Sequence, residues 1–198
     1  MTRLVVWRHG QTEWNAADRV QGQYDVPLSP LGREQAAAAA ARLAGLHPDA
    51  IVASDLRRAA DTAAALAGVT GLPVAADPRL RERYFGEWQG LTLAEVRRRW
   101  PAEFDRWRAG DPSPGGAIEH LEELAKRVAE ALREAAERSP GGTVVVATHG
   151  GAARQGCAGL LGWPEGVTRT LGGLANCHWT ELRDDPVRGW QLWGHNLS

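Results

Sequence analysis

The chain carries the stretch Leu4-Val5-Val6-Trp7-Arg8-His9-Gly10 near its start and Thr143-Val144-Val145-Val146-Ala147-Thr148-His149-Gly150 much later. Each begins as a short apolar run with β-branched residues, which is the pattern of a strand buried on both faces of a parallel sheet. A third such run is Ala50-Ile51-Val52-Ala53. Because strands that alternate with helices form a mainly parallel sheet covered on both faces, the sequence predicts a three-layer α/β/α sandwich.

The expected helices have recognisable ends. Ser29 is an N-cap with Pro30 at the first helical position, and Thr92 with Glu95 forms a capping box. The predicted helices cover 30 to about 43, 56–66 (closed by Gly68), 92–100, 101–110, 118–137 and about 152–161. Further strands are expected at 73–75, 176–182 and 189–193. We expect one domain over residues 1–198, with a small helical cap around 92–116.

Composition excludes several classes of protein. Of the 198 residues, 43% are hydrophobic and 24% charged, as in an ordinary soluble globular protein. The 23 Lys and Arg residues against 24 Asp and Glu leave no excess of positive charge for nucleic acid. No apolar run approaches the roughly 20 residues of a membrane span, and the N-terminus has no signal-peptide pattern. We therefore expect a cytoplasmic protein with no nucleic-acid or membrane partner.

Basic side chains and imidazoles follow the carboxyl ends of three predicted strands. Arg8 and His9 follow the first, Arg57 and Arg58 come just after the second, and His149 follows the Val-rich strand. Ligands of open α/β sheets bind at that edge. Alone, each residue is most simply a structural histidine or a solvated arginine. Together, guanidinium groups, imidazoles and helix N-termini at one edge predict a phosphate site.

Several motifs now point to one family. They occur in the order Arg8-His9-Gly10-Gln11-Thr12-Glu13-Trp14-Asn15, Gln21-Gly22-Gln23-Tyr24-Asp25, Ser54-Asp55-Leu56-Arg57-Arg58-Ala59, Leu80-Arg81-Glu82, Gly86-Glu87-Trp88-Gln89-Gly90 and His149-Gly150. The chain resembles the histidine phosphatase superfamily, the phosphoglycerate-mutase-like enzymes, over nearly its whole length. An isolated Arg-His-Gly would be a weak signal, whereas this ordered set is specific.

The resemblance implies a role for each matching residue. His9 matches the nucleophile that is phosphorylated during turnover, which requires a neutral imidazole with one nitrogen unprotonated. Arg8 and Arg58 match the pair that clamps the phosphoryl oxygens, and His149 is a further donor. Arg58 is preferred to Arg57 because the family arginine directly precedes an alanine.

Glu82 matches the family's proton donor to the leaving oxygen, because the negative charge of the phosphate favours a protonated carboxyl. The alternative for Glu82 is a surface salt bridge to Arg81 or Arg83. The resemblance also places Asn15, Gln21, Gly22 and Gly150 around the substrate. It implies neither a metal nor a cofactor, and a small phosphate ester as the partner. The resemblance also implies a homodimer.

Two features favour the phosphatase branch over the mutases. Mutases are generally longer, and they carry His-Tyr-Gly where this chain has Tyr84-Phe85-Gly86. The late block from Leu171 to Thr180 is similar to that of the glucosyl-3-phosphoglycerate phosphatases, which implies that substrate.

The chain departs from the family in one motif: the family's Gly-Gly-Glu-Ser is here Gly115-Gly116-Ala117-Ile118-Glu119-His120. Either Glu119 or His120 substitutes in the pocket, or the pocket takes a different ester.

Three hypotheses stay open beside the phosphatase: a cofactor-dependent phosphoglycerate mutase, a silent phosphate-binding protein on the same fold, and a metal hydrolase. No His-x-His or Asp-x-Asp spacing supports the last. One of Trp88, Trp100 and Trp107 is expected to face the pocket, where it could stack on a sugar ring. The two cysteines, Cys157 and Cys177, are expected to be free buried thiols.

Overall fold

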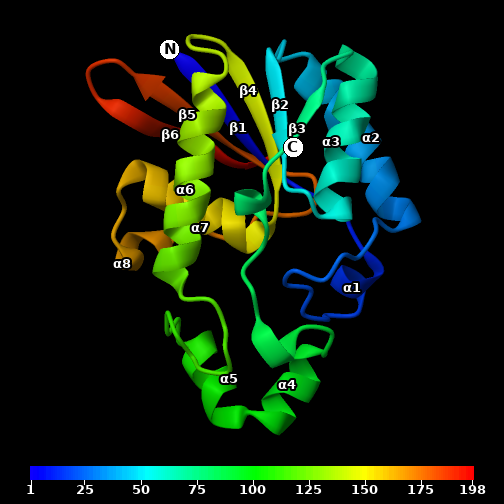
Figure 1. Cartoon of the computed structure of the whole chain (residues 1–198), viewed down its shortest axis with the longest axis vertical. Helices are drawn as coiled ribbons and strands as arrows, with labels where there is room; N and C mark the ends of the chain where they lie inside the picture. The colour runs from blue at the N-terminus through cyan, green and yellow to red at the C-terminus, as the bar shows by residue number, and fades with distance from the viewer.

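A six-stranded sheet runs through the centre of the computed structural model, which describes residues 1–198 (Figure 1). The strand order is β3-β2-β4-β1-β5-β6. The strands are β1 (Thr2–Arg8), β2 (Ala50–Ala53), β3 (Val74–Ala76), β4 (Thr143–Thr148), β5 (Trp179–Asp185) and β6 (Gly189–Leu197).

The two strands that are followed by His-Gly lie side by side. β1 pairs with β4 in parallel, and Arg8 is level with Thr148. β4 and β3 each pair with β2 in parallel, whereas β5 runs antiparallel to both β1 and β6. The sheet is therefore mostly parallel, as predicted. Its carboxyl edge brings the segments after β1, β2 and β4 together.

Helices cover both faces of the sheet, which confirms the predicted α/β/α layering. On one face, Val5 and Trp7 pack with α2 (Pro30–Ala44) and α3 (Arg57–Thr70) in a cluster of 15 buried residues. On the other, Leu4 and Val6 pack with α6 (Leu121–Glu137) and α7 (Gly150–Leu161) in a cluster of 19. The alternation along β1 thus supplies both cores, as expected for a strand buried on both faces.

Several boundaries differ from the prediction. α3 continues through Gly68 and ends at Thr70, because Gly71 is the residue that adopts the left-handed conformation of a C-cap. α6 begins only at Leu121, with His120 as its N-cap. Short elements with no periodic signal were not predicted: α1 (Glu13–Ala16), α8 (Glu165–Thr168) and the 3-10 turns η1 (Pro78–Leu80) and η2 (Gly86–Trp88).

Two short helices, α4 (Leu93–Arg99) and α5 (Pro101–Arg108), lie together at the lower end of Figure 1, away from the sheet. The predicted Thr92–Glu95 capping box begins α4. Ile118, expected in the long helix, instead packs with Trp88 and Val96 in a small core. These helices therefore have a core of their own and project beyond the carboxyl ends of the strands.

Both cysteines, Cys157 and Cys177, are free and buried, as expected. Burial raises the pKa of each thiol to about 12, so neither is a reactive thiolate near neutral pH. The longest helix, α6, has 17 residues and a charged face, and no helix combines the length and the apolar character that crossing a bilayer requires.

Candidate active site

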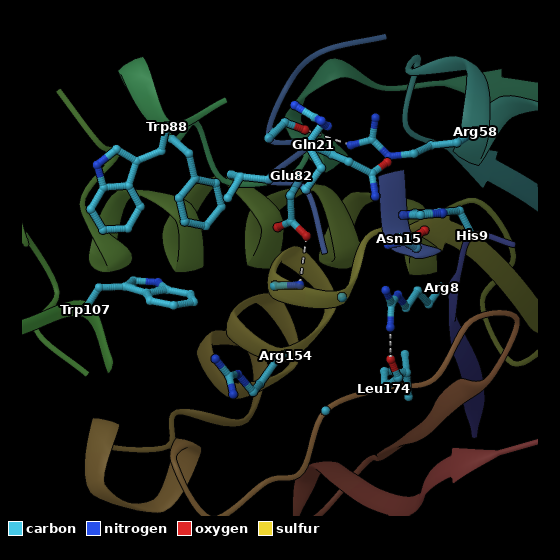
Figure 2. A pocket seen from close by; sticks show the side chains of 17 residues that line it. Arg8, His9, Asn15, Gln21, Arg58, Glu82, Trp88, Trp107, Arg154 and Leu174 are labelled. Atoms are coloured by element: carbon cyan, nitrogen blue, oxygen red, sulfur yellow. Dashed lines mark hydrogen bonds between the residues drawn. The ribbon is translucent and has the colours of Figure 1, made fainter. Parts of the chain in front are cut away.

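A cavity of about 340 Å³ lies at the carboxyl edge of the sheet (Figure 2). Its 17 lining residues include every predicted site residue except His149. Those present are Arg8, His9, Asn15, Gln21, Gly22, Arg58, Glu82 and Gly150. Residues up to 142 positions apart in the chain therefore meet at one cavity, because the strands that carry or precede them are neighbours.

His9 is buried and has a defined tautomer. Its Nδ1 lies 2.6 Å from the carbonyl oxygen of Gly10. Because a carbonyl only accepts, Nδ1 carries the proton and Nε2 keeps its lone pair. Burial, followed by the positive charges of Arg58 and Arg8, holds the pKa of His9 well below its ordinary value. The imidazole is therefore neutral at pH 7 and available as a nucleophile.

Two guanidinium groups lie beside His9, that of Arg58 buried and that of Arg8 half-buried. Arg58 donates to the backbone carbonyls of Gly22 and Tyr24, each at 2.7 Å. Burial lowers the pKa of Arg58 to about 10, so it remains a cation near neutral pH. Arg8 donates to the carbonyl of Leu174, while its buried Nε has no partner in the protein. A buried donor without an acceptor is costly, and an oxyanion in the cavity would satisfy it. Arg57 is exposed and does not line the cavity.

Asn15 and Gln21 present amide groups to the cavity. The Asn15 Oδ1 accepts from the backbone N–H of Thr12 at 3.0 Å in a capping box, which leaves its Nδ2 hydrogens as donors. Gln21 is buried, and its Oε1 has no partner. Gly22 has φ +52°, and a Cβ there would meet the Gln89 side chain at 2.1 Å. Glycine is therefore required at 22 for the loop to place its carbonyl on Arg58.

Glu82 faces the same cavity, and the salt-bridge alternative for it is wrong. Arg81 pairs with Asp55, at 2.5 Å, and the Arg83 guanidinium donates to backbone carbonyls. The Glu82 carboxyl instead accepts 2.9 Å hydrogen bonds from the backbone N–H groups of Gly151 and Ala152, at the start of α7. These bonds orient the carboxyl toward the cavity beside the nucleophile's strand. A Cβ at Gly151 would lie 2.6 Å from Glu82 Oε1, so this approach requires glycine.

His149 lies behind Arg58, not on the cavity wall. Arg58 Nε donates to His149 Nδ1 at 3.1 Å, so the ring proton is on Nε2, which is 2.9 Å from Ser54 Oγ. Burial and the charge of Arg58 hold the pKa of His149 well below its ordinary value. Its ring centroid is 5.2 Å from that of His9. Donation to a phosphoryl oxygen, the expected role, would require the ring to give up one of these bonds.

The far wall of the cavity contains two of the three tryptophans of which one was expected there, and an arginine that sequence reasoning missed. Trp88 and Trp107 line it, with ring centroids 5.9 Å apart, whereas Trp100 packs in the core around α4 and α5. Figure 2 also shows Arg154, from α7, near Trp107. Arg154 follows His149 by five residues, and only that spacing on a predicted helix could have suggested it.

Neither Glu119 nor His120 lines the cavity, so neither substitutes there in the way that the sequence left open. Glu119 pairs with Arg127, whose Nε lies 2.6 Å from Glu119 Oε1. Arg127 also donates to the carbonyls of Arg79, Arg81 and Glu82. The divergent loop thus supports the segment that carries Glu82. In the whole chain, no group of three or more His, Cys, Asp or Glu side chains could hold a metal ion.

A neutral, buried histidine beside one buried and one half-buried arginine, with a carboxyl in the same cavity, has the chemistry that phosphoryl transfer through histidine requires. The family model of the histidine phosphatase superfamily (branch 1) matches residues 4–197, and the chain belongs to this superfamily.

Individual members of the superfamily are similar to this chain over most of its length. The glucosyl-3-phosphoglycerate phosphatase of Mycolicibacterium vanbaalenii is 45% identical over 91% of this chain and 83% of its own length. The structure of a mycobacterial glucosyl-3-phosphoglycerate phosphatase in complex with VO3 has 40% identity and a TM-score of 0.93, with all of both chains covered. A probable phosphoglycerate mutase of Photorhabdus laumondii is 35% identical over 89% of this chain and 82% of its own length.

Proposed function

We propose that this protein hydrolyses a small phosphate monoester through a phosphohistidine at His9. The observation that carries this proposal is the unprotonated Nε2 of a buried His9 between Arg8 and Arg58. The two guanidinium groups neutralise charge on the equatorial oxygens of the transferring phosphoryl group. One of these oxygens also accepts the hydrogen bond for which Arg8 Nε has no acceptor in the protein.

In the first step, the lone pair of His9 Nε2 forms a bond to phosphorus as the bond between phosphorus and the ester oxygen breaks. The leaving oxygen takes the electron pair of that bond and a proton from Glu82. Asn15 and Gln21 donate to phosphoryl oxygens from the side. In the second step, a water oxygen attacks phosphorus and Glu82 takes its proton. The bond between phosphorus and Nε2 breaks, its electrons return to His9, and inorganic phosphate leaves.

For the physiological ester, the relatives favour glucosyl-3-phosphoglycerate. The aromatic wall supports this choice, because Trp107 is half-buried and lines the cavity, where its ring can stack on a sugar. A phosphoglycerate mutase is the second candidate, favoured by the similarity to probable mutases. We place the activity in the cytoplasm, in keeping with two free buried thiols.

The test is phosphate release, with EDTA present, from glucosyl-3-phosphoglycerate, mannosyl-3-phosphoglycerate, 3-phosphoglycerate, α-ribazole phosphate and p-nitrophenyl phosphate. We expect release that EDTA does not reduce and that His9→Ala abolishes, with the highest kcat/KM for glucosyl-3-phosphoglycerate. No release from any ester would overturn the proposal. Formation of 2-phosphoglycerate from 3-phosphoglycerate, when a catalytic amount of 2,3-bisphosphoglycerate is added, would then identify the mutase.

A further inference from the structure

The cavity has more positive charge than a phosphate ester needs. Its lining contains the guanidinium groups of Arg8, Arg19, Arg58 and Arg154 against the single carboxyl of Glu82. With His9 neutral, the balance is three positive charges when Glu82 is ionised and four when Glu82 carries the proton that the first step requires. The dianion of a phosphate monoester brings two negative charges. At least one cation on the wall is therefore left without a counter-charge.

Arg154 is the cation that remains. Arg8 donates to the Leu174 carbonyl, Arg19 to that of Gly90, and Arg58 to two carbonyls and His149. The Arg154 guanidinium forms no hydrogen bond and no ion pair with any residue of the chain, although the residue is half-buried in the wall. A partly desolvated guanidinium without an acceptor favours an anion, and its planar geometry suits a carboxylate.

The position of Arg154 relates it to the leaving group. It lies three residues after Gly151 on α7, so both residues face the cavity from the same side of the helix. The N–H of Gly151 holds Glu82, which protonates the leaving oxygen in the proposed reaction. Figure 2 shows Arg154 on the side of Glu82 away from His9, toward Trp107. A group attached to the leaving oxygen would extend in this direction.

We propose that Arg154 forms a carboxylate subsite for the leaving group, so that the enzyme prefers phosphate esters of hydroxy acids. This inference rests on the proposed phosphatase function. It assigns Arg154 to substrate selection, whereas Arg8 and Arg58 bind the phosphoryl group that every ester shares. The carboxylate would then orient the leaving oxygen toward Glu82.

The test compares two esters that differ chiefly in one group. 3-Phosphoglycerate carries a carboxylate where glycerol 3-phosphate carries a hydroxymethyl group. We measure kcat/KM for both with wild type, Arg154→Gln and Arg154→Lys. The matched control is Arg98→Gln, which removes the same charge from the exposed surface of α4. All assays contain EDTA, and His9→Ala provides the blank.

We expect wild type to prefer 3-phosphoglycerate by on the order of 10- to 100-fold, the range of a hydrogen-bonded charge pair. Arg154→Gln should remove most of this preference, Arg154→Lys should keep part of it, and Arg98→Gln should keep all of it. Equal losses for both esters in Arg154→Gln, or no preference in wild type, would overturn the subsite while the phosphatase function stood. If wild type releases no phosphate from these or any other ester, the phosphatase function itself is wrong.

Discussion

His9 and His149 are both buried beside guanidinium groups, and this environment keeps both imidazoles neutral. Desolvation is the larger cause for each, and the charge of Arg58 adds to it. The hydrogen bonds then decide which nitrogen carries the proton: Nδ1 in His9 and Nε2 in His149. In the mechanism that we propose, the arginines that bind phosphate thereby also prevent protonation of the nucleophile.

The same burial makes stability depend on pH. The pKa of His149 is below its ordinary value in the folded state, so below about pH 6.5 the unfolded chain binds a proton that the folded chain excludes. The free energy of unfolding of wild type should therefore fall on acidification from pH 6.5 to 5. Each buried histidine contributes up to about 1.4 kcal/mol per pH unit. Urea unfolding of wild type and His149→Gln over this range measures the effect.

His149→Gln should show a slope shallower than wild type by roughly 1 kcal/mol per pH unit. The control is His47→Asn, because His47 is exposed with φ +50°, a conformation that asparagine tolerates. Its slope should match that of wild type. Equal slopes for wild type and His149→Gln would show that His149 is not held neutral by the fold.

The residues at the strand ends could be predicted because sequence order and parallel pairing place them together. Arg8, His9 and Arg58 follow from that argument and from the family motif. The placement of His149 behind Arg58 could not be predicted, since it depends on a hydrogen bond across 91 positions. Arg154 has no signal of its own in the sequence, because a lone arginine on a helix is usually solvated.

Among the elements, the segment from η1 to η2 depends on α6 for its position. Arg127 on α6 binds the carbonyls of Arg79, Arg81 and Glu82, and Glu119 holds the Arg127 guanidinium. Glu119 Oε2 also accepts from the backbone N–H of Tyr84 at 3.1 Å. The pair therefore supports the chain on both sides of Glu82, although it does not reach the cavity.

Glu119→Gln removes the charge that orients Arg127 and should let Glu82 move. Proton donation matters most for poor leaving groups, so kcat for an alkyl ester such as glycerol 3-phosphate should fall by roughly 10-fold. The fall for p-nitrophenyl phosphate should be several-fold smaller, because p-nitrophenolate leaves with little protonation. Steady-state kinetics with both esters measure this difference.

The control variant for this prediction is Glu134→Gln, on the same helix. Glu134 also pairs with an arginine of the segment, Arg79, but on the exposed surface, where ion pairs contribute little. It should leave the ratio of the two rates as in wild type. If Glu119→Gln slows both esters equally, the Arg127–Glu119 pair stabilises the fold without positioning Glu82.

The elements were predictable where periodicity and caps agree. β2 was predicted at its observed boundaries, and the ends of α2 and the start of α4 were predicted to within one residue. The prediction was wrong at Gly68, because a helix tolerates an exposed glycine and nothing crowds that position. It was also wrong at the start of β5, which was expected at residue 176. The positive φ of Cys177 is incompatible with a strand there, so β5 begins only at Trp179. Such turns are set by contacts such as that from Cys177 N–H to the His9 carbonyl.

At the scale of the whole molecule, the sheet has one long free edge. β6 forms this edge with nine residues, and the exposed side chains of Val187, Trp193 and Leu197 lie in or beside it. The Arg183 guanidinium stacks on the Trp193 ring at 3.9 Å. An unpaired edge strand with apolar side chains favours association with another chain. We predict that the homodimer expected from the family resemblance forms through this edge.

Sedimentation equilibrium tests this prediction. Wild type should be a dimer at micromolar concentration, and Trp193→Glu should shift it toward the monomer because a charge replaces the apolar contact. Phosphatase activity of the variant shows whether it is folded. A monomeric wild type, or a Trp193→Glu variant that remains a dimer, would contradict an interface at β6.

The central claim is that His9 carries the phosphoryl group during turnover. The most direct measurement is to quench the enzyme within milliseconds of mixing with a phosphate ester, under alkaline conditions that preserve phosphohistidine, and to locate the added mass by mass spectrometry. We predict a phosphoryl group on His9, formed in the presence of EDTA, and no phosphate release from His9→Ala. A phosphoryl group on another residue, or a His9→Ala variant that turns over at the rate of wild type, would contradict the account.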